Sequence, residues 1–307
     1  DWPGFRPLFR CAVVELKPPA DADEGHLPFR AITVALSAIE SGVVFFDDPI
    51  QRDSEIDALI EAALEHWLQQ GNAPLCYQPK HRLQDRQLVG AEALLRMRDG
   101  EGRPIAPMRV ISLLRRQGRL ADLEWATLQS AVHFLQHFRQ DGAALTIAVN
   151  VSAESLRLPD FGLRLQELLQ LHDIPGAMLR LEIVEWTEIV ERDVVDANIT
   201  QLLAAGVTLS LDDFGAGYST LILLSQLAIA EVKIEQALIA TLSDAKSQSI
   251  VRFIVEVAHR CGAIVVAEGT ETLAQEQKLR ALGVDVGQGY LYSAALPADE
   301  FRRFAAS

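Results

Sequence analysis

The sequence contains little cysteine. The three cysteines lie far apart and form no CxxC pair: Cys11, Cys76 and Cys261. This spacing argues against a structural zinc site and against a disulfide framework, and reduced thiols are typical of the cytosol. No run of about 18 apolar residues occurs and no signal peptide is visible, so the sequence predicts neither a membrane span nor export. We therefore expect a cytoplasmic domain.

Positive charge is also scarce. The chain has 28 Lys and Arg residues against 42 Asp and Glu residues, a formal net charge of -14. This balance argues against a surface for duplex nucleic acid, which requires a basic patch. A small anionic ligand would then need metal ions to supply the positive charge. Because the first residue is Asp1 rather than Met, we expect a longer protein, in which an upstream segment is free to anchor the chain at the inner membrane.

Apolar residues, by contrast, make up 49% of the 307 residues, enough for one large α/β barrel or two ordinary domains. From residue 75 onward short apolar runs alternate with helical patterns, including two amphipathic helices at 108–118 and 120–138, as in sheets built from βα units. Eight candidate strands favour a closed TIM-like (β/α)8 barrel. The strands are LCYQP, LVGAEAL, LTIAVNVS, MLRLEIVE, VTLSLDD, AEVKIE, AIVVAEG and VDVGQGY.

The turn between the first two strands, HRLQDRQ, is too short for a helical crossover. We therefore expect a hairpin there and one antiparallel strand in the barrel. An amphipathic helix over residues 55–70 leads into the barrel, so the barrel domain is predicted to span residues 55–307. Residues 1–54 read as a separate small α/β segment, or the tail of one, followed by a linker.

Strand parity predicts which side chains enter the barrel. Alternate residues of a strand face opposite sides, and helices cover the outside of such a barrel, so the apolar faces should point outward. The opposite faces then carry polar residues toward the carboxyl ends of the strands, where barrels of this type place their active sites. These residues are Asn150, Glu182, Asp212 and Lys233, with Glu235 on the same face as Lys233.

Two adjacent carboxylates, Asp212 and Asp213, precede a loop that contains Gly215 and Gly217. Neighbouring like charges raise each other's pKa unless a cation lies between them. A solvated surface is the ordinary interpretation of such a pair, but the apolar run before it and the glycine loop after it favour a cation site. Three further polar residues stand near strand ends: Glu92, Glu268 and Gln288. Carboxylate and amide oxygens with no histidine nearby suit Mg²⁺ or Mn²⁺ rather than zinc.

With these residues in place, the chain resembles the EAL domain family of cyclic di-GMP phosphodiesterases. Eight motifs of that family occur in order over about 215 residues, which makes chance a poor explanation. They are YQPK (77–80), EALLR (92–96), NVS (150–152), LEIVE (181–185), DDFGAGYSTL (212–221), KIE (233–235), AEGTET (267–272) and QGYLYS (288–293).

The resemblance implies hydrolysis of cyclic di-GMP to linear pGpG with two Mg²⁺ or Mn²⁺ ions. It implies a first metal held by Glu92, Asn150, Glu182 and Asp212, and a second held by Asp212, Asp213 and Glu268. Lys233 would orient or activate the attacking water, and Glu271 would hold the loop after Asp213, which the family also uses at its dimer interface. The implied substrate contacts are Gln78, Lys80, Arg96 and Gln288.

The chain departs from the family pattern at Glu235, where Asp is usual, and this longer side chain beside Lys233 is expected to slow the chemistry. An active phosphodiesterase is the first interpretation, because the implied ligand set is complete. A cyclic di-GMP receptor without turnover and a protein interaction module on the same barrel are the alternatives. Residues 1–54 resemble, more weakly, the tail of a GGDEF domain, so an upstream sensory or GGDEF-like domain is expected.

Overall fold

The computed structural model describes residues 48–140, 145–184, 192–212, 214 and 219–306. The chain divides into two compact units, residues 1–62 and 63–307. The α/β segment expected over residues 1–54 lies almost entirely outside the described residues, which begin with helix α2 (Asp48–Gln70). In the described part of the chain, no helix combines the length and the apolar character needed to cross a membrane.

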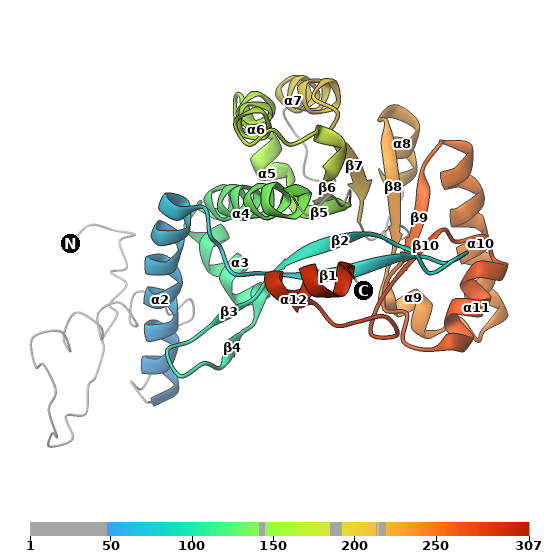
Figure 1. Ribbon diagram of the computed structural model, residues 1–307, viewed down its shortest axis with the longest axis horizontal. Helices are drawn as coiled ribbons and strands as arrows, with labels where there is room; N and C mark the ends of the chain where they lie inside the picture. The colour runs from blue at the N-terminus through green and yellow to red at the C-terminus, as the bar shows by residue number, and fades with distance from the viewer. Residues whose placement is uncertain (1–47, 141–144, 185–191, 213, 215–218, 307) are drawn as a thin grey trace, which may run out of the picture. The chain divides into compact units, whose positions relative to one another are not determined.

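The second unit is built around a closed barrel of eight strands (Figure 1). Strand β1 runs antiparallel to both of its neighbours in the barrel, β2 and β10, and the other neighbours are parallel. This confirms the TIM-like fold and its single antiparallel strand. The strands are β1 (Leu75–Arg82), β2 (Leu88–Leu95), β5 (Thr146–Ser152), β6 (Leu179–Val184), β7 (Thr208–Leu211), β8 (Ile229–Ile234), β9 (Ile264–Ala267) and β10 (Val286–Gln288).

Three short strands were not expected from the sequence. Strands β3 (Met97–Arg98) and β4 (Pro104–Ile105) form a small ribbon, and β11 (Leu296–Pro297) pairs with the first part of β1. With two residues each, they are too short to produce an alternating apolar pattern.

Helices connect and cover the strands of this unit. Helix α4 packs against β5, α10 against β8 and β9, and α12 against β1. The two expected amphipathic helices are present as α3 and α4. The helices are α3 (Pro107–Arg116), α4 (Leu120–Gln140), α5 (Ala153–Leu156), α6 (Phe161–Leu171), α7 (Arg192–Ala204), α8 (Ser219–Gln226), α9 (Gln236–Ala240), α10 (Ala245–Arg260), α11 (Leu273–Ala281) and α12 (Ala298–Ala305), with a 3₁₀ turn at Gly176–Met178.

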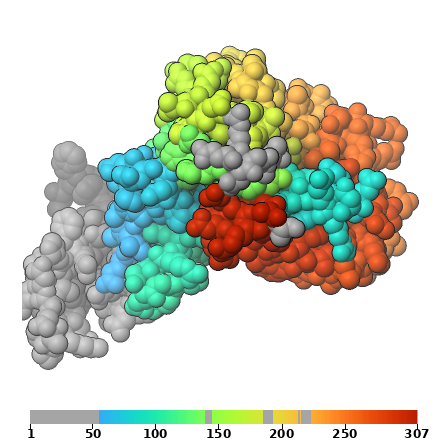
Figure 2. Space-filling view, in the orientation of Figure 1, coloured from blue at the N-terminus to red at the C-terminus, as the bar shows by residue number. Residues whose placement is uncertain are grey.

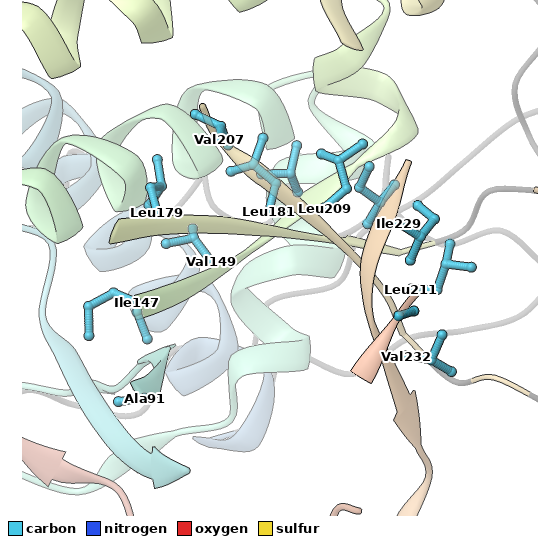
Figure 3. Close-up of a cluster of buried hydrophobic side chains, with 14 of the residues drawn as sticks. Ala91, Ile147, Val149, Leu179, Leu181, Val207, Leu209, Leu211, Ile229 and Val232 are labelled. Atoms are coloured by element: carbon cyan, nitrogen blue, oxygen red, sulfur yellow. The ribbon is translucent and has the colours of Figure 1, made fainter. Parts of the chain in front are cut away.

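The apolar strand faces point outward into the layer between strands and helices. Ile147 and Val149 of β5 pair with Leu179 and Leu181 of β6, and all four are completely buried. Figure 3 shows these side chains with those of the neighbouring strands. The same buried cluster includes helix residues such as Leu128 of α4, so the strands are sealed from outside by helix side chains. The opposite faces are therefore free to carry polar groups inside the barrel.

The turn of the β1–β2 hairpin lies against helix α11 and the start of β10. Arg86 pairs with Glu276 of α11, and the Leu83 N–H donates to the Asp285 carbonyl at 2.9 Å. In the space-filling view the cyan atoms of this hairpin lie directly beside the orange-red C-terminal elements (Figure 2). The hairpin thus connects the beginning of the barrel to its end.

Candidate active site

Lys233 is the centre of a cluster of carboxylates near the carboxyl ends of the parallel strands. Its ammonium nitrogen Nζ lies 2.7 Å from Glu182, 2.6 Å from Glu268, 3.2 Å from Asp212 and 3.5 Å from Glu92. These residues come from β8, β6, β2 and the ends of β9 and β7. The convergence confirms that strand parity sends the polar faces of these strands inward.

A second set of contacts orients Glu92. The Asn150 amide donates to Glu92 Oε1 at 2.9 Å, and the Gln288 amide donates to Glu92 Oε2 at 2.7 Å and to Gln78 Oε1 at 3.1 Å. Because the side-chain nitrogen Nδ2 of Asn150 donates to Glu92, the side-chain oxygen Oδ1 is the atom available to a cation. Gln288 is buried, and its Oε1 has no hydrogen-bond partner among the described residues.

A pocket of about 340 Å³ opens above this cluster. We call it the carboxyl-end pocket. Its lining includes Gln78, Glu92, Asp212, Lys233, Glu268, Glu271, Gln288 and Tyr290. Gly269, with a φ of 63°, turns the chain directly after Glu268, and a Cβ at this position would lie 2.3 Å from Gln236 Cγ. The turn that aims Glu268 into the pocket therefore requires glycine.

The charges of the cluster shift one another's pKa. Burial lowers the pKa of Lys233, but the carboxylates around it outweigh burial and hold that pKa well above its ordinary value. Burial, and then the charge of Glu182, raises the pKa of Glu92. For Glu182, burial acts upward, but Lys233 and Lys80 bring its pKa below the ordinary range. Four carboxylates thus surround the Lys233 ammonium, and even with Lys80 as a second cation at Glu182 the formal charge of the cluster is negative.

The donor set suits a hard divalent cation. Four carboxylates and the Asn150 carbonyl supply only oxygen ligands, which Mg²⁺ and Mn²⁺ prefer. Within the described ranges, no three acidic, histidine or cysteine side chains are already arranged as ligands of one ion, since their oxygens surround the Lys233 ammonium. An ion would therefore be held after these carboxylates turn from the ammonium, and the residues present fit that role in their chemistry. Asp213, the remaining expected ligand, lies outside the described residues.

The structure places Lys80 away from the pocket, which corrects its expected contact with substrate. Its side chain is buried, and its ammonium donates to Glu182 at 2.7 Å and to Glu231 at 2.8 Å. Lys80 lines a different cavity, at the amino ends of the parallel strands. Gln78 and Lys80 share the inward face of β1, but β1 runs antiparallel to its neighbours, so Gln78 reaches the carboxyl-end pocket and Lys80 lies nearer the amino ends of the parallel strands.

Glu235 also differs from the expectation that it faces the barrel interior beside Lys233. Strand β8 ends at Ile234, and Glu235 is the exposed N-cap residue of helix α9. It does not line the carboxyl-end pocket. Strand parity holds only while the strand continues, so it does not extend to Glu235, and the structure assigns this residue no contact with the cluster around Lys233.

The remaining expected residues are Arg96 and Glu271, of which only Glu271 lines the pocket. Arg96 follows β2, is exposed, and donates from its guanidinium to the Leu95 carbonyl at 2.9 Å. Glu271 is exposed and lines the pocket, and it directly precedes the capping box that Thr272 and Gln275 form at the start of α11. The loop that Glu271 was expected to hold falls on residues 213 and 215–218, outside the described part, so this role stays a prediction.

Sequence reasoning missed three groups of residues. Tyr290, which is 73% exposed, lines the pocket. Glu231 is completely buried and accepts hydrogen bonds from Lys80, Arg180 and Ser210. Arg180 and Glu231 lie on the same strand faces as Glu182 and Lys233, so the alternation of β6 and β8 contains the signal for this second polar layer.

Glu124 of α4 is the third functional group that the sequence pattern did not reveal. Its buried carboxylate accepts from the Ser152 N–H at 3.0 Å and from the hydroxyls of Ser152 and Ser155. Burial raises the pKa of Glu124 to about 7. Glu124 therefore fixes the chain just past Asn150, at the carboxyl end of β5. The helical pattern marked this segment only as a packing helix, because a contact across 28 residues has no local signature.

The fold and the acidic, oxygen-rich pocket place this domain among the α/β barrels whose functional site lies at the carboxyl ends of the strands. The model of the EAL domain family matches residues 61–295. The chain belongs to the EAL domain family.

Curated relatives match most of this chain. The chain is 32% identical over 265 residues to the bifunctional diguanylate cyclase/cyclic di-GMP phosphodiesterase MucR of Pseudomonas aeruginosa, covering 85% of this chain and 38% of that protein. It is 29% identical over 303 residues to the cyclic di-GMP phosphodiesterase PdeR of Escherichia coli, covering 96% and 45%. The chain thus spans less than half the length of either relative.

Solved structures of similar fold include two that contain cyclic di-GMP. The MucR phosphodiesterase in complex with cyclic di-GMP has a TM-score of 0.71 and 32% identity, covering 79% of this chain and 99% of that one. A Klebsiella pneumoniae protein in complex with manganese and cyclic di-GMP has a TM-score of 0.63 and 26% identity, covering 73% and 56%.

Proposed function

We propose that this domain hydrolyses one phosphodiester bond of cyclic di-GMP to give linear pGpG, with two Mg²⁺ or Mn²⁺ ions as cofactors. The observation that carries the proposal is the convergence of Glu92, Glu182, Asp212 and Glu268 on one point at the floor of the carboxyl-end pocket. Four carboxylates against the two ammonium groups of Lys233 and Lys80 leave formal negative charge that divalent cations would neutralise.

Two groups of side chains would hold the ions. Glu92, Asn150, Glu182 and Asp212 serve the first ion, and Asp212, Asp213 and Glu268 serve the second. When bound, such ions lower the pKa of a water molecule and stabilise charge on the attacking and leaving oxygens. Lys233, whose ammonium lies among these carboxylates at the floor of the pocket, would act as a hydrogen-bond donor that orients the attacking water.

The pocket wall supplies groups for a cyclic dinucleotide. Gln288 Oε1, which has no partner among the described residues, can accept from the ligand, and the Gln78 amide nitrogen can donate to it. Tyr290 offers an exposed aromatic ring on which a guanine can stack, and base stacking is worth about 1–3 kcal/mol in other systems. Arg96, exposed just past the end of β2, suits a phosphate, which a guanidinium binds through paired hydrogen bonds.

The known relatives support this substrate. PdeR is a cyclic di-GMP phosphodiesterase, and the MucR domain was solved with cyclic di-GMP. The Klebsiella pneumoniae structure contains both manganese and the same dinucleotide. These properties belong to those proteins, and their similarity to this chain motivates the choice of substrate and metal.

The direct test is to incubate the purified chain with cyclic di-GMP and either Mg²⁺ or Mn²⁺ and to separate the products by chromatography. We expect linear pGpG in both cases and none after chelation with EDTA. Binding measured with Ca²⁺ in place of these metals reports affinity without turnover. Saturable binding without product would make the domain a receptor. The absence of both binding and product would contradict the proposal.

We also propose that the domain acts in the cytoplasm and forms a homodimer through its barrel, as the family resemblance implies. An upstream sensory or GGDEF-like domain is proposed for the full-length protein, and the greater length of MucR and PdeR supports it. Sedimentation of the chain at several concentrations tests the dimer. A monomer at micromolar concentration would contradict it.

A further inference from the structure

A cavity larger than the carboxyl-end pocket lies at the opposite end of the barrel. Its volume is about 570 Å³, against about 340 Å³ for the pocket around Lys233. The lining comes from the first residues of the parallel strands, such as Thr146 and Ile264, and from the last residues of antiparallel β1. We call it the amino-end cavity. No step of the proposed hydrolysis uses it.

The charge of this cavity is opposite to that of the pocket. Its lining carries four cationic side chains, Lys80, Arg82, Arg180 and Arg280, and only two carboxylates, Glu231 and Asp285. Such an excess of cations is unusual in a chain with a formal net charge of -14. A concave surface with one sign of charge attracts ligands of the other sign.

The deep cations are held in fixed positions. Arg180 donates to Thr208 at 3.1 Å and to Glu231, and its side chain is 15% exposed. Lys80 also donates to Glu231, and its second carboxylate partner is Glu182 at 2.7 Å. Fixed donors lose little entropy when a ligand binds. Of these groups Lys80, Arg180 and Glu231 line the cavity, whereas Glu182 does not line it and is shared with Lys233.

The rest of the lining adds two guanidinium groups, Arg82 and Arg280, and one carboxylate, Asp285. Arg280 of α11 is exposed and lines the cavity. The nearby Asp285 carboxylate is engaged, because it accepts from the Val265 N–H and contacts His259 Nε2, each at 2.8 Å. Arg82 pairs with Asp85 at 2.9 Å in the hairpin turn. A ligand that enters would thus pass two guanidinium groups before it reaches Arg180.

We propose that the amino-end cavity is a binding site for a small phosphate ester, with the phosphate between Arg180 at the floor and Arg280 at the mouth. The guanidinium group matches phosphate through paired, charge-assisted hydrogen bonds. The volume lies within the range of about 300–1,000 Å³ typical of small-molecule sites and admits an ester the size of a sugar phosphate or mononucleotide. This site is separate from the proposed cyclic di-GMP site.

The test uses the whole chain in EDTA, because the metal-free carboxyl-end pocket is acidic and repels phosphate. Isothermal titration with ribose 5-phosphate should show one saturable site, and inorganic phosphate should compete for it. R280Q should weaken binding about tenfold, the effect of one lost charge-assisted hydrogen bond. R260Q is the matched control, since Arg260 is exposed on α10, does not line the cavity, and should leave affinity unchanged.

Two results would overturn the proposal. One is the absence of saturable binding, and the other is an equal loss of affinity in R280Q and R260Q, which would mean general attraction to surface charge. R180K provides a second check: it keeps the positive charge near Glu231 but removes the guanidinium fork, so it should also weaken binding. Because the titration requires neither metal nor turnover, its result is independent of whether the domain hydrolyses cyclic di-GMP.

Discussion

The two ends of the barrel interior carry opposite charge. At the carboxyl end four carboxylates surround Lys233, and at the amino end Lys80 and Arg180 converge on Glu231. Glu182 joins the two ends, because its carboxylate accepts from both Lys233 and Lys80 at 2.7 Å. The same inward strand faces build both layers, so the position along the strand decides the sign of the charge and hence the kind of ligand.

The largest effect on the difference between the two ends is expected when a carboxylate is removed from the carboxyl-end pocket. E92A should reduce kcat for cyclic di-GMP hydrolysis at least about a thousandfold, because an anionic ligand of the metal is lost and no neighbour replaces it. Product formation under saturating Mn²⁺ is the measurement, and the amino-end titration with ribose 5-phosphate is the control that should not change. Undiminished turnover would remove Glu92 from the metal site.

The link between the two ends is tested by Lys80. K80M should lower the free energy of unfolding by about 3 kcal/mol, because Glu182 and Glu231 each lose a buried partner. Urea denaturation gives the value. R82M, on the same strand but with an exposed ion pair to Asp85, is the control and should change stability little. Equal stability of K80M and the parent would mean that the two carboxylates do not depend on Lys80.

The buried carboxylate of Glu124, which holds the carboxyl end of β5, predicts a pH effect on stability. Folding raises the pKa of Glu124 from 4.5 to about 7, so the folded state binds the proton more tightly and stability falls as pH rises between these values. E124Q cannot lose this proton. The destabilisation that E124Q causes should therefore be about 2 kcal/mol larger at pH 5 than at pH 8 in urea denaturation.

The control for this prediction is E167Q, the same substitution at an exposed position of α6. It should show no difference between the two pH values. If E124Q behaves like E167Q, the Glu124 carboxyl titrates as it does in the unfolded chain, and its contacts with Ser152 and Ser155 contribute no pH-dependent stability.

The smallest effect is expected at Glu235, just beyond the layer that faces the pocket. E235D and E235A should both keep kcat within about twofold of the parent, because the side chain is exposed and touches neither Lys233 nor the pocket. A K233A variant measured in parallel should lose most of its kcat. A large loss in E235A would restore Glu235 to the catalytic machinery and contradict the position of this residue at the start of α9.

The alternation within each strand explains why much of the site was predictable. Asn150, Glu182 and Lys233 lie in strands with apolar residues on both sides, and a two-residue period is a local property of the sequence. Glu235 was misplaced because the strand ended one residue earlier. Strand ends depend on packing and on the following helix, which local periodicity does not report.

The sequence by itself determined the eight strands, the antiparallel hairpin, the inward polar faces and the family, because alternation and motif spacing depend only on neighbours along the chain. Only the tertiary structure decided which inward residues meet. Lys80 reaches Glu182 across 102 residues and Glu231 across 151, which places it between the two ends of the barrel instead of in the pocket. Barrel closure sets such contacts, since it fixes how far each strand is shifted against the next, and that shift brings carboxylates to one end and cations to the other.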